Sequence, residues 1–381
     1  MKTSAKLLAL LTLVVPTAAS ASASDDLAAL GRALYFDGNL SYNRTQSCAS
    51  CHAPDRAFVD PRGAGELAAA SLGDDGRSIG DRNAPSAAYA RFSPPFHRRD
   101  DGRYVGGQFL DGRARDLAEQ AGGPPLNPIE MGMPDKAAVV ARLRANPTYV
   151  DGFRRLFGED VWDQVDTGYA AMTECIAAFE QTPEFAPFDS KYDRYLRGEY
   201  RLTEQEDLGM TLFFSQQFTN CNLCHQLKPR AAMAGETFSN YEFHNIGTPP
   251  NRALRALNGK GEAFVDRGLL DHPAVDDSAQ AGRFKVPSLR NVAVTGPYMH
   301  NGVFKDLRTV VLFYNKYNSR SARRQINPET GERWAGPEVG ENLSLKELET
   351  GPALDDRRVD ALVAFMKTLT DQRYEPLLDV Q

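Results

Sequence analysis

No apolar run in this sequence of 381 residues approaches the roughly 20 residues that a membrane-spanning helix needs. Basic side chains are not in excess either: 44 Lys and Arg stand against 50 Asp and Glu, and the formal net charge is −6. Nucleic acid is therefore not expected as a partner. Alternation of apolar and polar residues, the pattern of a half-buried strand, is scarce. These absences argue against a membrane span in the mature chain, a nucleic-acid-binding protein and a β-rich fold.

The N-terminus has the pattern of a secretory signal peptide. Lys2 and Lys6 precede a short apolar run over residues 7–15, and small residues follow, with Ala-x-Ala patterns that predict cleavage near Ala21 to Ala23. We expect residues 1–23 to be removed and the mature protein to be periplasmic. The alternative is that the segment stays as an N-terminal anchor. The remaining chain is long enough for two or three domains.

Histidine is scarce, with six residues, yet two of them end a repeated motif. The motifs are Cys48-Ala-Ser-Cys51-His52 and Cys221-Asn-Leu-Cys224-His225, and together they use four of the five cysteines. Two thiols at this spacing can form thioethers to one porphyrin, while the adjacent His binds the iron. The sequence therefore predicts two covalently bound c-type haems, with His52 and His225 as iron ligands.

Two other interpretations of the cysteine pairs stay open: a structural zinc site, or two disulfides. Neither requires a His directly after the second Cys in both copies, so we favour haem. The fifth cysteine, Cys175, lies in a helical pattern of apolar residues and is expected to be a packed core thiol.

A similar segment precedes each motif, over residues 30–36 and 208–214, and both predict helices with Leu and aromatic residues on the buried side. Thr203 and Glu206 form a capping-box pattern before the second. Helical spacing also covers residues 136–146, 163–181 and 359–369. Gly/Pro-rich connections run over about 60–108 and 226–288. We expect a mainly α fold of two cytochrome-c-like helical domains, residues 24–190 and 191–381, each carrying one haem.

The second axial position of each iron decides its chemistry, because a filled position restricts the haem to electron transfer and an open one admits peroxide or oxygen. Outside the motifs the histidines are His97, His244, His272 and His300. None of them lies between residues 53 and 96. The first haem therefore has no nearby His in the sequence to close it.

Several segments resemble the bacterial di-haem cytochrome c peroxidase family, which includes the methylamine-utilisation enzyme MauG. They run in family order through most of the chain: residues 47–52, 82–85 (RNAP), 111–114 (DGRA), 120–131 (QAGGPPLNPIEM), 284–292 (FKVPSLRNV) and 297–302 (PYMHNG). The resemblance implies a peroxidatic haem in the first domain and an electron-transferring haem in the second.

The resemblance also implies that Gln120 and Glu130 lie on the distal side of the first haem. A carboxylate there can take a proton from hydrogen peroxide and return it to the leaving oxygen. Without the resemblance, Glu130 would be interpreted as an exposed loop acid or a helix-cap partner.

For the second haem the family has a Met or a Tyr in the helix after the His-x-Gly turn, and here that position is Tyr314. A phenolate stabilises oxidised iron, whereas a thioether raises the potential. The alternative is that Tyr314 packs in the core and that Met299 or His300 closes the iron. We expect His300 to act instead from the second shell of this haem. His97 is expected on a surface loop.

The family further implies a calcium ion between the domains, held by Asn83 and by backbone oxygens of Thr295 and Pro297. Otherwise Asn83 would simply cap a turn. One departure concerns a Trp that the family usually has between the haems. Leu110 occupies its position here, so electron transfer must use Phe109, another aromatic such as Tyr104, or direct tunnelling.

The expected function is that of a di-haem peroxidase, which reduces hydrogen peroxide with electrons from a small cytochrome c or copper protein. A MauG-like oxidation of a partner protein is the alternative within this class. A non-catalytic electron-transfer cytochrome with both irons six-coordinate is the alternative from another class, and it predicts no response to cyanide or peroxide.

Overall fold

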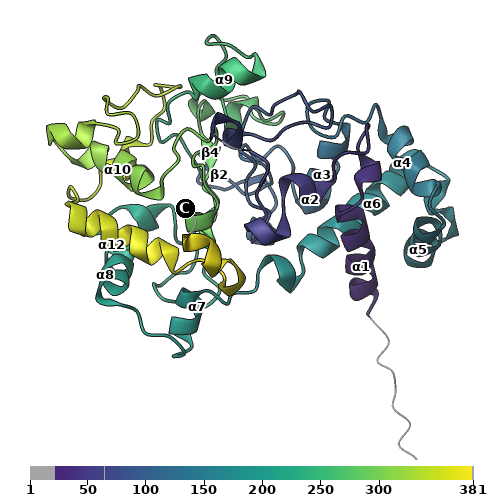
Figure 1. Ribbon diagram of the computed structural model, residues 1–381, viewed down its shortest axis with the longest axis horizontal. Coiled ribbons are helices and arrows are strands. Elements are labelled where there is room, and N and C mark those ends of the chain that lie inside the picture. Colours follow the sequence, from purple (N-terminus) through teal and green to yellow (C-terminus); the bar gives the residue numbers. More distant parts are fainter. Residues whose placement is uncertain (1–21, 64, 380–381) are drawn as a thin grey trace, which may run out of the picture.

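Helices dominate the chain, which the computed structural model describes over residues 22–63 and 65–379 (Figure 1). The predicted signal peptide lies almost wholly outside the described residues. The helices of the first half are α1 (Ala23–Tyr35), α2 (Cys48–Cys51), α3 (Leu117–Ala121), α4 (Lys136–Arg144), α5 (Pro147–Phe157) and α6 (Val165–Glu180). Those of the second half are α7 (Lys191–Leu196), α8 (Glu204–Phe214), α9 (Arg252–Asn258), α10 (Leu307–Asn318), α11 (Leu345–Leu348) and α12 (Asp356–Lys367).

The strands are short and form two antiparallel pairs: β1 (His97–Arg98) with β2 (Tyr104–Val105), and β3 (Phe243–His244) with β4 (Phe284–Lys285). The mainly helical fold agrees with the expectation from the sequence. None of the described helices is both long and apolar enough to cross a bilayer.

The longer predicted helices are confirmed within a few residues by α4, α6 and α12. The capping box before α8 is also present. Thr203 Oγ1 accepts a hydrogen bond from the Glu206 amide at 3.3 Å, and the Glu206 carboxylate accepts one from the Thr203 amide at 2.8 Å. Both bonds satisfy amides that the first helical turn leaves unpaired.

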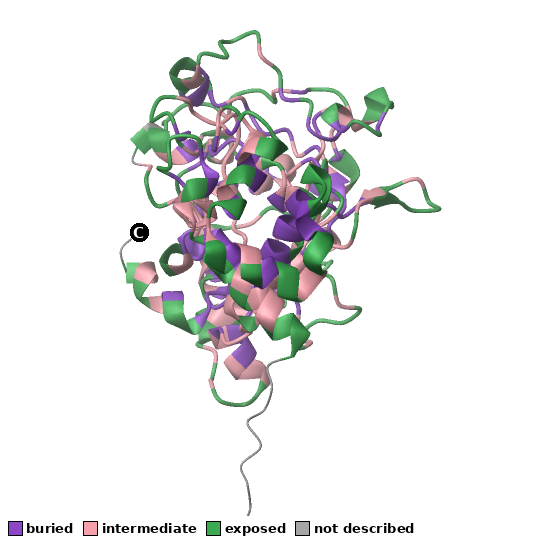
Figure 2. Cartoon of the chain, turned by 90° about the vertical axis from the view of Figure 1, so that its right-hand side faces the viewer, coloured by how far each residue is buried: buried purple, intermediate pink, exposed green. Residues whose placement is uncertain are grey.

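Two separate apolar cores hold these helices. One contains buried side chains from Leu34 to Ala186, and the other contains buried side chains from Tyr192 to Leu369. Figure 1 shows the helices of the two halves on opposite sides of the molecule, with the short strands and long connections between them. Viewed from the side of the first half, the buried residues lie inside a layer of exposed helix faces and loops (Figure 2).

The helix before each Cys-x-x-Cys-His motif crosses a second helix at a glycine. A Cβ on Gly31 of α1 would lie 1.8 Å from the carbonyl oxygen of Cys175 on α6. A Cβ on Gly209 of α8 would lie 1.9 Å from the carbonyl oxygen of Ala361 on α12. Only glycine permits backbones to approach this closely. The repeated module of the sequence is therefore a repeated helix crossing in the structure.

Buried polar contacts join the two halves. Arg82 donates to both carboxylate oxygens of Asp266, at 2.6 and 2.7 Å, and to Asp111 at 2.5 Å. The Tyr89 hydroxyl donates to Asp371 at 2.6 Å. These side chains are largely buried, so a shift of one half relative to the other would leave buried polar groups without hydrogen-bond partners. This fixes the position of each half relative to the other.

We expect Gly31→Ala and Gly209→Ala each to lower the free energy of unfolding by about 3 kcal/mol, because the new methyl group meets a backbone carbonyl that cannot rotate away. Gly152→Ala is the matched control, since its Cβ would meet only methyl groups of Leu30 at 3.4 and 3.5 Å. Chemical denaturation followed by far-UV circular dichroism measures the difference. Equal stability of all three variants would contradict the close crossing.

Candidate functional site

A cavity of about 390 Å³ lies beside the first motif. Cys48, Cys51 and His52 line it, and so do Gln120 and Glu130, which the resemblance places on the distal side. The cavity has the volume of an ordinary cofactor pocket. Its lining offers two thiols, one imidazole and a mostly apolar wall, so the residues present fit a c-type haem.

The imidazole of His52 is oriented by a backbone carbonyl. Its Nδ1 lies 3.2 Å from the carbonyl oxygen of Phe58, while the Tyr35 hydroxyl donates to the carbonyl oxygen of His52 at 2.8 Å. With Nδ1 bonded to a carbonyl, Nε2 carries the free lone pair. Burial lowers the pKa of His52, which keeps the imidazole neutral. A neutral and oriented imidazole is the form that binds iron.

The second motif repeats this arrangement beside a cavity of about 350 Å³ that is lined by Cys221, Cys224 and His225. The Nδ1 of His225 lies 2.9 Å from the carbonyl oxygen of Phe238, and burial lowers the pKa of His225 to about 4. The same orienting bond therefore occurs at both motifs, and the second cavity also fits a haem.

The two other interpretations of the cysteine pairs gain no support. All four motif cysteines are free thiols. In the described part of the chain, no three or more His, Cys, Asp or Glu residues form a group that could hold a metal ion. Cys175 is fully buried in the first core, as expected.

A backbone hydrogen bond holds Glu130 at the first cavity, and the surroundings of its carboxyl group change the pKa of that group. The Glu130 carbonyl oxygen accepts a hydrogen bond from the Asp74 amide at 2.7 Å, which anchors the loop. Burial raises the pKa of Glu130, and the Arg113 charge and a bond to Asn127 offset part of that rise. A carboxyl with a raised pKa exchanges protons more readily near neutral pH than an exposed one.

Gln120 reaches the same cavity from the end of α3, a helix whose first turn is capped by Asp116. The structure thus brings Gln120 and Glu130 to the cavity of the first motif, although ten residues separate them in the sequence.

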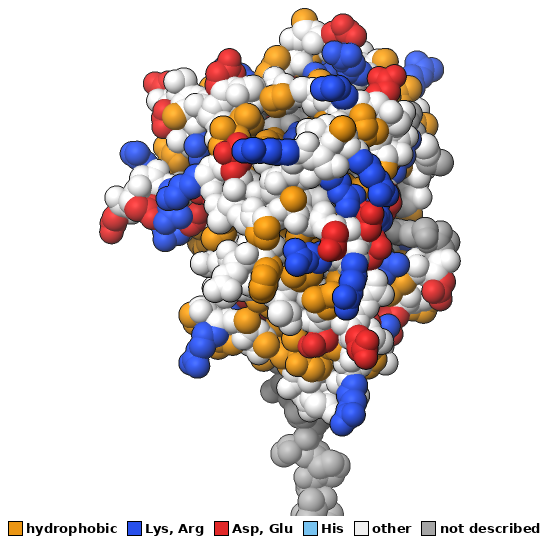
Figure 3. All heavy atoms as spheres, turned by 90° about the vertical axis from the view of Figure 1, so that its left-hand side faces the viewer, with side chains coloured by type: hydrophobic (Ala, Val, Ile, Leu, Met, Phe, Trp, Pro, Cys, Tyr) orange, Lys and Arg blue, Asp and Glu red, His pale blue; other side chains and the backbone are white. Residues whose placement is uncertain are grey.

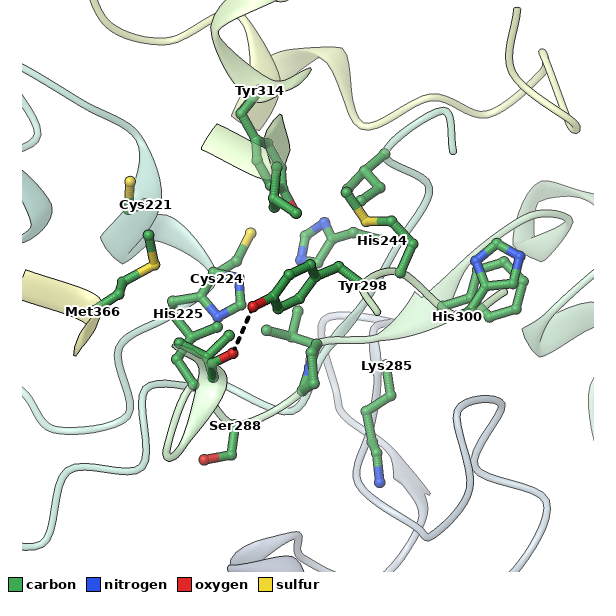
Figure 4. A pocket seen from close by; sticks show the side chains of 18 of the residues that line it. Cys221, Cys224, His225, His244, Lys285, Ser288, Tyr298, His300, Tyr314 and Met366 are labelled. Carbon is green, nitrogen blue, oxygen red and sulfur yellow. Dashed lines mark hydrogen bonds between the residues drawn. The ribbon is translucent and has the colours of Figure 1, made fainter. Parts of the chain in front are cut away.

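In the second cavity, Tyr314 projects from α10 and Met299 lies in the preceding loop. Figure 4 shows the hydroxyl end of Tyr314 directed into the space near Cys224 and His225. Burial raises the pKa of Tyr314 well above its usual value, with the neighbouring cysteines contributing. Met366 of α12 lines the same cavity. All three sequence candidates for the sixth ligand, Tyr314, Met299 and His300, therefore line this cavity, together with a second methionine.

His300 lies between the second cavity and a smaller polar one. Its ring stacks on Phe284 with centroids 3.6 Å apart and an angle of 9° between the planes. Its Nε2 finds no hydrogen-bond partner among the described residues, and burial lowers the pKa of His300 to about 3. The stacking fixes the ring at the wall of the cavity, where a second-shell role remains the prediction.

The three residues implied as calcium ligands all line the second cavity: Asn83, Thr295 and Pro297. The Asn83 amide donates to the carbonyl oxygen of His300 at 2.8 Å, which brings the two halves together at this point. The calcium site itself stays a prediction.

One layer of residues separates the two cavities, because residues 83–86, 90 and 108–110 line both of them. Phe109 and Leu110 belong to this layer, and the Arg113 guanidinium covers the Phe109 ring at 3.7 Å. Tyr104 instead stacks on Phe96, with centroids 5.6 Å apart, away from both linings. The structure therefore removes Tyr104 as a candidate relay and leaves Phe109 or direct tunnelling.

His97 is exposed on β1, which confirms the surface position predicted for it. Sequence reasoning missed three side chains that line the cavities. His244 and Met366 line the second one, and Glu180, at the end of α6, lines the first. Burial raises the pKa of Glu180 to about 8. The buried face of the predicted helix over residues 163–181 was the one signal that could have identified Glu180. His244 lies on a two-residue strand that has no periodicity to detect.

The family model for di-haem cytochrome c peroxidase matches residues 25–201. The chain is 57% identical to methylamine utilization protein MauG of Paracoccus denitrificans, over 98% of this chain and 96% of that protein. It is 32% identical to cytochrome c peroxidase Ccp of Escherichia coli, over 76% of this chain and 53% of that protein.

Among solved structures, the diheme peroxidase BthA of Burkholderia thailandensis is similar to the chain with a TM-score of 0.80 and 34% sequence identity. The match covers 96% of this chain and 90% of that one. The similarity therefore extends through both halves and both cavities, including the segments beyond residue 201.

Proposed function

The chain belongs to the di-haem cytochrome c peroxidase family, and we propose that it uses hydrogen peroxide to oxidise side chains of a partner protein. Its general activity is that of a peroxide-dependent di-haem oxidoreductase with two haem cofactors. The observation that carries the finer proposal is Tyr314, which lines the second cavity in place of the methionine of ordinary peroxidases. The extended identity to MauG supports it.

A bound haem supplies an iron whose open face reacts with hydrogen peroxide. The residues of the chain prepare that reaction. We propose that Cys48, Cys51, Cys221 and Cys224 attach the haems and that His52 and His225 hold the irons through Nε2. Glu130 accepts a peroxide proton at its carboxylate and delivers it to the leaving oxygen, while the Gln120 amide orients the substrate.

Tyr314 is proposed as the second ligand at the C-terminal site. Tyr314 would hold the iron as a phenolate, and that anion would stabilise the oxidised metal. A site that favours the oxidised state retains oxidising equivalents better than it relays single electrons. Met299 and His300 are the less favoured ligands: the ring of His300 is held against Phe284, and Met299 lies in a loop rather than on a helix.

We also propose that each core and its cavity form one cytochrome-c-like haem domain, over residues 24–190 and 191–381. The predicted signal peptide over residues 1–23 supports export to the periplasm. Calcium held by Asn83, Thr295 and Pro297 would brace the lining of the second cavity where the halves meet.

The partner is proposed to be a protein rather than a small molecule alone. On the face of the second half, acidic and basic side chains are intermingled with hydrophobic ones (Figure 3). A mixed surface of this kind selects a partner by local complementarity rather than by net charge.

Ordinary peroxidase activity, with electrons from a small cytochrome c or copper protein, is the second candidate. Leu110 favours it, because a leucine in the shared layer cannot relay an electron hole between the two sites. This candidate needs only one-electron delivery to the first site.

Glu130→Gln is expected to keep both haems but to slow the reaction with hydrogen peroxide by about 10²-fold, the usual scale for loss of a general acid–base group. In the native protein the rate should fall as the pH drops through the raised pKa of Glu130, because the accepting carboxylate becomes protonated. The variant should lack this limb. Stopped-flow absorbance measures both effects, with the exposed Glu119→Gln as the matched control. An unchanged rate would remove Glu130 from the mechanism.

Ligation by Tyr314 predicts a ferric spectrum without the near-infrared band of methionine coordination. Tyr314→Met should gain that band, since Met has the length to reach the same space. Tyr317→Phe, one turn further along α10, is the control and should leave the spectrum unchanged. Finding the band in the native protein would assign the ligand to Met299 or Met366 instead.

Retention of oxidising equivalents distinguishes the two candidate functions. After one equivalent of hydrogen peroxide is added without a donor, the protein should accept two electrons in a later reductive titration. With reduced cytochrome c or a small copper protein, its steady turnover should be slow. Tyr314→Met should reverse this balance and speed donor-dependent turnover. Fast turnover by the native protein with no retained equivalents would favour the ordinary peroxidase.

A further inference from the structure

His244 is a buried imidazole in the second cavity to which neither sequence motif nor proposed mechanism gives a role. It lies on β3, where its backbone pairs with Phe284 of β4. Its side chain is 10% exposed. Figure 4 shows the ring inside the cavity, in the region toward which Tyr314 points. His244 and His225 are also close enough for the charge of His244 to lower the pKa of His225.

The Nδ1 atom of His244 has a partner. It lies 3.3 Å from the Ser344 hydroxyl, and the Ser344 amide is itself fixed by the carbonyl oxygen of Asn245 at 2.8 Å. A hydroxyl can donate to an unprotonated ring nitrogen, which leaves the proton on the other nitrogen. We assign the Nε2–H tautomer, because the Glu242 carboxylate lies on the Nε2 side.

Glu242 does not accept that proton. Its carboxylate is 3.8 Å from Nε2, beyond hydrogen-bonding distance. Its two oxygens are occupied by Arg99 at 2.7 Å and by Arg103 at 2.9 Å, both from the β1–β2 segment of the first half. Nε2 consequently finds no hydrogen-bond partner among the described residues. A buried donor without an acceptor is costly, so the cavity must supply an acceptor when it is filled.

The groups that face His244 leave one suitable acceptor at the site of ligation. Burial lowers the pKa of His244 and keeps the ring neutral. The charges of Glu347 on α11 and of Glu242 oppose this shift, and those of Arg283 and Arg103 add to it. Glu347 also lines the cavity, and its charge raises the pKa of Cys224 as well. Tyr314, once deprotonated for ligation, would present an anionic oxygen, which is a stronger acceptor than any neutral group.

We propose that His244 is a positioning residue of the second haem site, whose Nε2–H donates a hydrogen bond to the phenolate oxygen of Tyr314. The inference rests on the proposed ligand role of Tyr314. The bond would hold the phenolate in place against competition from Met299 and Met366. It would also withdraw charge from the oxygen and so moderate the preference for oxidised iron. Because Arg99 and Arg103 occupy the carboxylate of Glu242, the Nε2–H group of His244 stays free to donate to Tyr314.

Substitutions at His244 test the bond without measuring activity. His244→Leu removes the donor, and His244→Gln restores one through its amide. With the donor lost, the ferric form of the second haem should be favoured about tenfold, a fall of about 59 mV in its midpoint potential. His244→Gln should recover most of this shift, and Ser344→Ala should give a smaller shift in the same direction. The first haem serves as the internal reference, and Glu347→Gln as the control for a neighbouring acid.

The outcomes separate the inference from the proposed function. If His244→Leu leaves the potential and the ferric spectrum of the second haem unchanged while Tyr314→Phe alters them, the hydrogen bond is wrong and the ligand assignment stands. If Tyr314→Phe leaves the spectrum unchanged, both fall. Loss of the low-spin signal in His244→Leu but not in Tyr314→Phe would make His244 itself the ligand and overturn the inference. Haem staining after denaturing electrophoresis confirms that each variant carries both haems.

Discussion

The hydrogen bond between Nδ1 of each motif histidine and a backbone carbonyl is the interaction on which the two sites depend. The acceptors are the carbonyl oxygens of Phe58 and Phe238. Both residues have a positive φ, 57° in each case, which turns the carbonyl toward the imidazole. Without that bond the ring could rotate and present either nitrogen. The backbone at Phe58 and Phe238 is therefore strained, at a cost in free energy, and this strained backbone orients the imidazole ring at each site.

The two sites share this foundation and differ in what completes them. The helix crossing at a glycine, the cysteine pair and the oriented imidazole occur in both halves. The remaining lining comes from segments that have no counterpart in the other half. Gln120 and Glu130 bring an amide and a carboxyl group to the first cavity, whereas Tyr314 brings a phenol to the second. The division of labour between the sites thus arises from the loops and helices around a repeated module and not from the module itself.

The features that could be predicted from the sequence are those with a regular period or a fixed spacing of residues. Cys-x-x-Cys-His is local, and the helices that became α4, α6, α8 and α12 carry apolar faces at helical intervals. The positions of Gln120, Glu130 and Tyr314 came from resemblance, because nothing in their own spacing points to a cavity. The role of His244 in lining a site could not be predicted. Its strand is two residues long, and its partners Ser344 and Glu242 are brought together by tertiary packing. Tyr104 lines neither cavity, and this could not be predicted for the same reason, since its two-residue strand has no periodicity that would indicate the direction of the side chain.

Leu110 favours an ordinary peroxidase, whereas Tyr314 favours the oxidation of a partner protein. The layer of residues that lines both cavities makes the two observations compatible. Among the described residues that line both cavities, Phe109 is the sole aromatic one, and the Arg113 cation over its ring raises the cost of removing an electron from it. Hopping through an oxidised side chain is therefore unfavourable.

However, the same residues contact both cavities, so the barrier between them is a single layer thick. Direct tunnelling across one layer requires no oxidisable intermediate. Under the proposed function, the residue at position 110 would affect the rate at which the sites exchange electrons, while Tyr314 as ligand would determine where oxidising equivalents are held. A protein with Leu110 and Tyr314 can still store charge at the second site, provided that its partner reacts more slowly than the two sites equilibrate.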